Sequence, residues 1–163
     1  MSLSTKAPSD SDKIAIVGTS YGGYMTFLAT TKLPQLWAAG AAIVGMTDWK
    51  EMYELSDALF RSFIERYFGK PEGNPQLYHD RSPINYVENI WAPLLIWHRG
   101  NDSRCPLGPV EKFANRLKEQ GKKYEMEVVG RGAWSPEDRE LGQTVQGCRF
   151  LPRQGTENTR VTI

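Results

Sequence analysis

The chain has 163 residues, of which 20 are basic and 19 acidic, and 40% of its residues are hydrophobic. This length is typical of one domain with a sizeable core. The near balance of charge gives no electrostatic reason for binding nucleic acid or a membrane surface, and no apolar stretch has the length of a membrane span. We therefore expect a globular domain with no nucleic-acid or membrane partner.

The first part of the chain predicts two strands and one helix. Residues 1–12 are polar and rich in Ser, Asp and Pro, and we interpret them as a leader or loop. Lys13–Val17 is predicted to be a strand that is apolar on both faces, which favours a central parallel strand covered by helices. Tyr21–Thr31 is predicted to be a helix that ends before Pro34. Ala38–Val44 is then a second buried strand of small residues.

The second part continues the alternation of helices and strands. Residues 51–68 predict one helix whose wide apolar stripe we interpret as core rather than as the lining of an acyl or peptide pocket. Pro93–His98 is a third buried strand, and Gly108–Gln120 is a helix with apolar residues at i, i+3, i+4 and i+7. Lys123–Val129 alternates apolar and charged residues, which is typical of a half-exposed edge strand.

The alternation of strands with helices predicts an α/β fold with a mostly parallel sheet of about four strands flanked by helices. We place this domain at residues 13–140. Beyond Glu140 no period is sustained, so residues 141–163 are interpreted as an irregular tail.

One motif carries chemistry. Gly18-Thr19-Ser20-Tyr21-Gly22, followed by Gly23, stands between the first strand and the first helix. This is the context of a nucleophile elbow, in which a sharp turn exposes the Ser at the carboxyl end of the sheet beside the N–H groups of a helix N-terminus. Glycine is needed at Gly18 and Gly22 because side chains there would collide with neighbouring backbone. The alternative is a glycine-rich turn without catalytic meaning.

Asp102 follows the third strand in Arg99-Gly100-Asn101-Asp102. An α/β-hydrolase keeps its orienting carboxylate in such a loop, although an Asn-Asp turn would have the same sequence. We interpret His79 as a surface residue and His98 as a packing residue at the end of the strand. Cys105 and Cys148 have no metal-type spacing and predict no disulfide, so we expect no metal or cofactor and a reducing, cytoplasmic setting.

Several segments together resemble the prolyl oligopeptidase family of serine peptidases, which includes dipeptidyl and acylaminoacyl peptidases. They are Gly-Thr-Ser-Tyr-Gly-Gly-Tyr-Met, Tyr-Phe-Gly, Arg81–Tyr86, Pro93–His98 and Asp102 followed by Cys105-Pro106, in the family's order over about residues 10–140. The resemblance implies the C-terminal part of an α/β-hydrolase catalytic domain, a partial fold. It further implies Ser20 as nucleophile, Asp102 as its carboxylate partner, the Tyr21 backbone N–H as an oxyanion donor, and a peptide or small acyl substrate.

Three departures from the family pattern stand out. Arg99 occupies a position that is usually Gly. The family places its catalytic His in a Gly-His-Gly-like turn after the fourth strand, where this chain has Gly130-Arg131-Gly132-Ala133-Trp134; Ala133 is the position expected for the His. Only 12 residues precede Lys13, so the strands and the oxyanion loop that the family has before the elbow are absent from this sequence. We therefore expect weak or no turnover by this chain.

The main hypothesis is a serine peptidase that works by acyl transfer. An esterase for small acyl esters and a non-catalytic binding or assembly module are the alternatives. If no strand precedes Lys13–Val17, its edge is open and apolar, which predicts a homo-oligomer that pairs through this edge.

Overall fold

The computed structural model describes residues 14–130, and every structural statement below concerns that part of the chain. The strands are β1 (Ala15–Thr19), β2 (Ala39–Ile43), β3 (Leu94–Arg99) and β4 (Tyr124–Val129). The α-helices are α1 (Tyr21–Lys32), α2 (Trp49–Leu55), α3 (Ala58–Phe68), α4 (Pro75–Arg81) and α5 (Leu107–Glu119). Two 3₁₀ helices, η2 (Pro34–Leu36) and η3 (Pro83–Asn89), complete the set. The predicted leader 1–12 and tail 141–163 lie outside the described residues.

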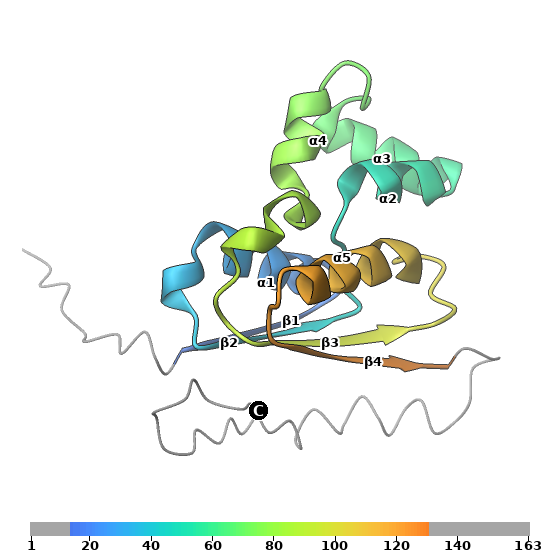
Figure 1. Cartoon of the computed structure of the whole chain (residues 1–163). Coiled ribbons are helices and arrows are strands. Elements are labelled where there is room, and N and C mark those ends of the chain that lie inside the picture. Colours follow the sequence, from blue (N-terminus) through green and yellow to red (C-terminus); the bar gives the residue numbers. More distant parts are fainter. Residues whose placement is uncertain (1–13, 131–163) are drawn as a thin grey trace, which may run out of the picture.

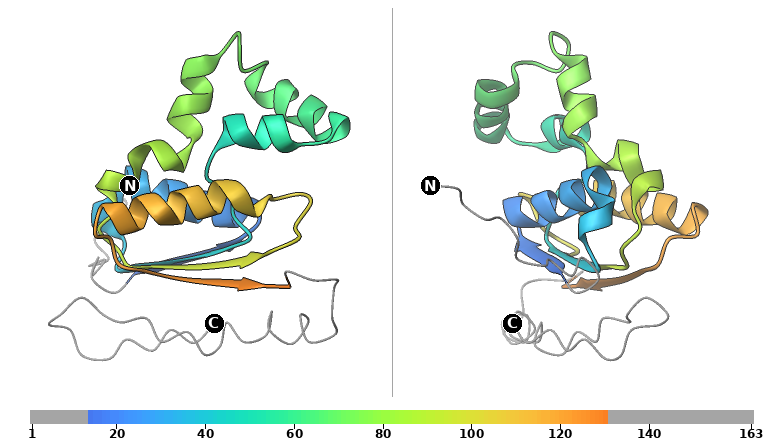
Figure 2. Two further views of the ribbon diagram at one scale, coloured as in Figure 1. Left: turned by 45° about the vertical axis from the view of Figure 1, so that its right-hand side comes forward. Right: turned by 90° about the vertical axis from the view of Figure 1, so that its left-hand side faces the viewer.

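The strands form one parallel sheet in the order β1-β2-β3-β4, so neighbours in sequence are neighbours in the sheet. Helices α1 and α5 pack on the same face of this sheet, and α2, α3 and α4 form a lobe farther out on that side (Figure 1 and Figure 2). The predicted α/β class, the parallel sheet and the flanking helices are confirmed. Parallel strands need a crossover, and the helices supply it.

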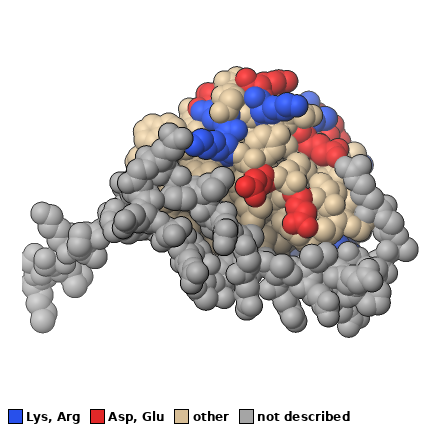
Figure 3. Space-filling model, turned by 60° about the horizontal axis from the view of Figure 1, so that its bottom comes forward, with Lys and Arg blue, Asp and Glu red and all other residues tan. Residues whose placement is uncertain are grey.

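The main core lies between the sheet and its two covering helices. Along β3 every second residue is buried, and the side chains of Leu94 and Ile96 join those of α1 and α5. The centre of this cluster consists of Phe27, Leu94, Ile96, Phe113 and Leu117. On the other face, the register aligns Val17, Ala41, Leu95 and Glu125 in one row across the sheet. The described surface on that side is mostly uncharged with a few acidic groups (Figure 3).

The first strand differs from its prediction in two respects. It runs from Ala15 to Thr19, two residues later than expected, and it lies at an edge of the described sheet rather than in its middle. Val17 is 38% exposed, so the expectation of burial on both faces was wrong. An apolar strand pattern reports what could be buried, whereas the neighbours that bury it are set by the tertiary structure.

The single helix predicted over residues 51–68 is two helices, because the chain breaks at Ser56–Asp57. Asp48 caps α2 by accepting from the N–H groups of Lys50 and Glu51, and Asp57 caps α3 by accepting from Phe60 N–H. Each Asp therefore starts a new helix.

The apolar stripe of this segment is only partly core. Ile64 is 1% exposed and packs in a second cluster, whereas Leu59, Phe63 and Tyr67 are 75, 50 and 66% exposed. The prediction that the stripe is core was wrong for this outer face. Sequence periodicity identifies the apolar face of a helix, but it does not show how much of that face other elements bury.

The structure contains two further elements that the sequence patterns did not predict, one in the lobe and one between the lobe and the main core. Helix α4 begins after Asn74 with Pro75 at its first turn, and η3 begins with Pro83. Both are short, so neither builds a sustained apolar period. None of the helices within residues 14–130 is both long and apolar enough to cross a membrane.

Candidate active site

Ser20 lies where β1 bends directly into α1. It occupies the N-cap of α1 with φ 57° and ψ −116°, and it is exposed. Its N–H donates to the carbonyl of Ile43 at 2.9 Å, and its own carbonyl accepts from Tyr24 N–H at 3.0 Å. These bonds hold a positive φ that residues with a Cβ rarely adopt, and such strain is typical of functional sites. The predicted strand–turn–helix geometry is present.

Two close backbone approaches require glycine at this bend. A Cβ on Gly18 would lie 2.3 Å from the carbonyl carbon of Gly22, which leaves no room for any side chain. A Cβ on Gly22 itself would meet no atom within 4 Å, so the predicted collision at Gly22 was wrong. A Cβ on Gly23 would lie 2.8 Å from the Cα of Gly45, which follows β2. The helix can therefore start immediately above the sheet, with its free N–H groups beside Ser20.

Asp102 lies in the turn after β3, at the same carboxyl edge of the sheet. Its Oδ1 accepts from Arg104 N–H at 2.8 Å and from Cys105 N–H at 2.7 Å. These bonds use a single oxygen of the carboxylate. They fit an Asp turn and also fit a carboxylate held ready to accept from a base, so the catalytic role of Asp102 stays a prediction.

Cys105 connects the two predicted catalytic residues. Its N–H donates to Asp102, and its thiol makes a polar contact with the Ser20 side chain. Burial, and then the charge of Asp102, raise the pKa of this thiol to about 11, against a smaller lowering by the contact with Ser20. The thiol is therefore protonated at neutral pH, and it cannot take a proton from Ser20.

An aromatic cluster adjoins Ser20. Tyr24 packs against Tyr21 and Trp49 with ring centroids 5.3 and 5.1 Å apart, and Trp49 packs against Phe68 at 4.8 Å. Cys105 belongs to the same cluster, which brings it to Ser20. Asp48, which caps α2, thus places the buried Trp49 at the start of that helix, where its ring packs in this cluster.

The side chains of the two His residues have other partners than Ser20. His98 is fully buried, with its Nδ1 3.0 Å from the carbonyl oxygen of Arg99, as expected for a packing residue. His79 is exposed on α4, where its Nδ1 lies 3.3 Å from Asp80 Oδ1 and its ring packs against Tyr86. Ala133, the position expected for a catalytic His, lies outside the described residues.

Comparison with known proteins decides the family. The model of the prolyl oligopeptidase family matches residues 2–132, which is most of the chain. The chain belongs to the prolyl oligopeptidase family. It is 30% identical to the uncharacterized peptidase YuxL of Bacillus subtilis over 118 residues, covering 72% of this chain and 18% of that protein. It is 30% identical to esterase LipC of Mycobacterium tuberculosis over 124 residues, covering 67% and 31%.

Solved structures of this family have the same fold. An acylaminoacyl peptidase in complex with Z-Gly-Gly-Phe-chloromethyl ketone matches with a TM-score of 0.73 at 30% identity, covering 91% of this chain and 26% of that one. The acylaminoacyl peptidase of Pyrococcus horikoshii matches with a TM-score of 0.70 at 33% identity, covering 85% and 21%. The chain thus spans less than a third of the length of these relatives.

The sequence patterns did not predict three features of this candidate site. Cys105 was considered for metals and disulfides and as part of the family's Cys105-Pro106 segment, but no pattern predicted that its thiol contacts Ser20. Val44 has φ 50° directly after β2, a genuine outlier for a β-branched residue, and no sequence pattern indicates it. Tyr24, Trp49 and Phe68 come from three separate elements, so no local sequence pattern indicates that they form one cluster.

Proposed function

We propose that this chain carries serine-type acyl-transfer chemistry. The Ser20 hydroxyl oxygen attacks the carbonyl carbon of a peptide or acyl ester, the Tyr21 N–H stabilises the oxyanion, and Asp102 orients a base. The amine or alcohol leaves with the proton that the base took from the Ser20 hydroxyl. Water then hydrolyses the ester between the acyl group and Ser20. The observation that carries this proposal is the exposed Ser20 at φ 57° on the bend from β1 to α1.

The substrate is proposed to be a peptide. The ring of Tyr21, next to Ser20, is 58% exposed and packs on the buried Tyr24, so it offers an apolar surface for a substrate side chain. Names of relatives point the same way, since one match, 34% identical over 99 residues, is the dipeptidyl aminopeptidase BIII of Pseudoxanthomonas mexicana; it covers 57% of this chain and 14% of that protein. An ester substrate is the second candidate, and the likeness to an esterase favours it. Comparing turnover of peptide and p-nitrophenyl ester substrates separates the two.

We propose further that the 163-residue chain is a weak catalyst. Both of its His residues precede Asp102 in sequence, whereas the hydrolase order is Ser, Asp, His. The Cys105 thiol beside Ser20 is protonated at neutral pH, so it does not replace the base. Without a base, the Ser hydroxyl is a weak nucleophile, and the expected loss is several orders of magnitude in rate.

A fluorophosphonate probe tests this proposal on the whole chain. We expect slow labelling that is abolished in Ser20→Ala, because the strained hydroxyl is exposed but lacks a proton acceptor. Rapid, Ser20-dependent labelling would contradict the proposed weakness. Absence of labelling at high probe concentration would contradict Ser20 as a nucleophile and favour the non-catalytic binding module. In Ala133→His, faster labelling supports the assignment of that position, and no gain supports the binding module.

Two further parts of the proposal concern the setting of the chain. We propose self-association through the open edge of β1, because its backbone there has no strand partner within residues 14–130. We also propose a cytoplasmic location, which the buried free thiol of Cys105 supports.

A further inference from the structure

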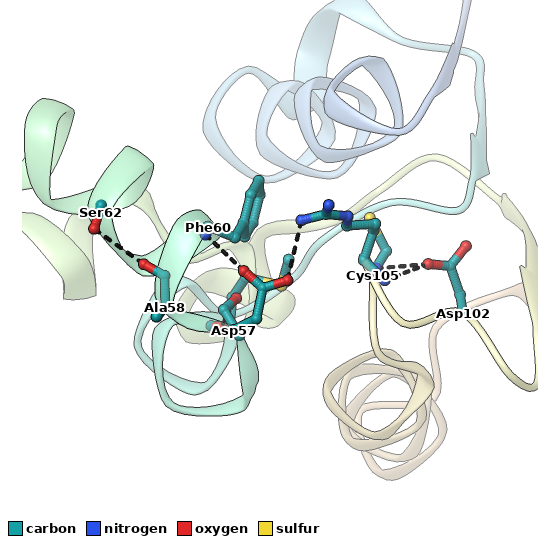
Figure 4. A network of polar contacts seen from close by, with 9 residues as sticks. Asp57, Ala58, Phe60, Ser62, Asp102 and Cys105 are labelled. Carbon is teal, nitrogen blue, oxygen red and sulfur yellow. Dashed lines mark hydrogen bonds and ion pairs between the residues drawn. The ribbon is translucent and has the colours of Figure 1, made fainter.

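The two oxygens of the Asp57 carboxylate serve two different parts of the molecule. Oδ1 accepts from Phe60 N–H at 2.8 Å and thereby caps α3. Oδ2 accepts from the Arg104 guanidinium, with Nη1 at 3.4 Å. Figure 4 shows Asp57 beside Phe60 in the middle of the drawn polar contacts, and Asp102 beside Cys105 at their far end. One side chain of the helical lobe therefore reaches the turn that follows β3.

Arg104 joins Asp102 to Asp57 through its main chain and its side chain. Its N–H donates to Asp102 Oδ1 at 2.8 Å, and its guanidinium pairs with Asp57 and lies 5.9 Å from the centroid of the Phe60 ring. The neighbouring N–H of Cys105 makes the second bond to the same Asp102 oxygen at 2.7 Å. A movement of α3 that displaces Arg104 therefore also displaces the two backbone N–H groups that donate to Asp102.

We propose that Arg104 is a positioning residue that couples the lobe of α2–α4 to the Asp102 turn. Its ion pair with Asp57 keeps the turn closed, so that the Asp102 carboxylate stays in one orientation. The mechanical coupling stands on these contacts alone; only its meaning for acyl transfer rests on the proposed function. The side chains of Arg104 and Asp57 are 59 and 61% exposed, so the pair is screened by solvent and its effect is modest.

Asp57→Asn isolates the ion pair, because Asn keeps an oxygen that can cap α3 but carries no charge. We expect the amide hydrogens of Arg104 and Cys105 to exchange about two- to fivefold faster in this variant, with little change at Phe60. Arg104→Gln should give the same increase, and Arg104→Lys, which keeps the positive charge, should restore part of the protection. The double variant Asp57→Asn with Arg104→Gln should exchange no faster than either single variant.

Glu54→Gln is the matched control. Glu54 is an exposed carboxylate of the preceding helix that pairs only weakly with Lys50, at 4.0 Å. Its neutralisation should leave exchange at Arg104 and Cys105 unchanged. Added salt is a measurement that needs no variant: it should speed exchange at these two amides in the unmodified chain and not in Asp57→Asn.

Unchanged exchange at both amides in Asp57→Asn would overturn the proposal, and so would an equal increase in Glu54→Gln or additive effects in the double variant. Fluorophosphonate labelling of Ser20 reports on the proposed function separately. Absent labelling with a faster-exchanging turn in Asp57→Asn refutes the acyl-transfer proposal and leaves the coupling standing. Labelling of Ser20 together with unchanged exchange in Asp57→Asn supports the acyl-transfer proposal and refutes the coupling.

Discussion

Ser20 holds a backbone conformation that has a cost. At φ 57° and ψ −116°, its Cβ is crowded, and strain of this kind is on the order of 1–3 kcal/mol. The two hydrogen bonds of its N–H and C=O and the close packing of Gly18 on Gly22 maintain this conformation. A residue chosen only for folding at this position would be Gly.

Replacement of Ser20 tests this strain directly. We expect Ser20→Gly to be more stable than Ser20→Ala by about 1 kcal/mol, because Gly tolerates the positive φ whereas Ala keeps the Cβ. Both variants lack the hydroxyl and its contact with Cys105, so each controls for that loss. Urea denaturation measures the difference. A Gly variant that is equal to or less stable than the Ala variant would show that the bend is unstrained.

At the scale of the element, α3 has two faces with different tasks. Its inner face carries Ile64 into the cluster with Tyr24 and Trp49, which adjoins the candidate site. Its outer face carries the half-exposed Phe63, whose ring packs against Phe60 at 5.7 Å and Tyr67 at 4.9 Å on the same helix. Both residues are large and apolar, so their contributions to stability should differ through burial alone.

Adjacent substitutions on α3 measure this difference. Ile64→Ala should lower the free energy of unfolding by about 2–4 kcal/mol, since Ile64 is 1% exposed and its removal leaves a cavity. Phe63→Ala should lower it by at most about 1 kcal/mol, because only aromatic contacts on an exposed face are lost. Thermal or urea unfolding of the two variants provides the values. Equal losses would mean that the outer face is covered in solution.

For the whole molecule, the decisive feature is that β1 stands at an edge of the described sheet. Val17 and Ile14 are 38 and 39% exposed there, and β1 contains no Pro to block pairing. The candidate site lies at the end of this same strand. A second copy pairing along β1 would therefore lie beside Ser20.

Concentration-dependent light scattering tests the edge. We expect the chain to associate as concentration rises, and Val17→Lys to reduce association, because a charged side chain on an edge strand discourages pairing. Leu59→Lys is the control, since it places the same charge on a 75% exposed apolar residue of α3. A strictly monomeric chain at high concentration contradicts edge pairing. Dissociation by Leu59→Lys but not by Val17→Lys would move the interface to α3.

The sequence was sufficient for those features whose signal is local. Gly18, Ser20 and Gly22 between an apolar run and a helical pattern predicted the bend, and the close approach at Gly18 is the reason that the turn needs glycine there. The period of α5 and the alternation of β4 predicted those elements within one or two residues. Asp102 was placed in the turn after β3 by its position behind an apolar run.

Only the tertiary structure decided which surfaces meet. The edge position of β1, the exposed outer face of α3 and the contact of Cys105 with Ser20 depend on neighbours that are distant in sequence. The same holds for the link from Asp57 to Arg104, which spans 47 residues. A local pattern states what a segment can bury or donate; the packing of the sheet against its helices determines what it actually contacts.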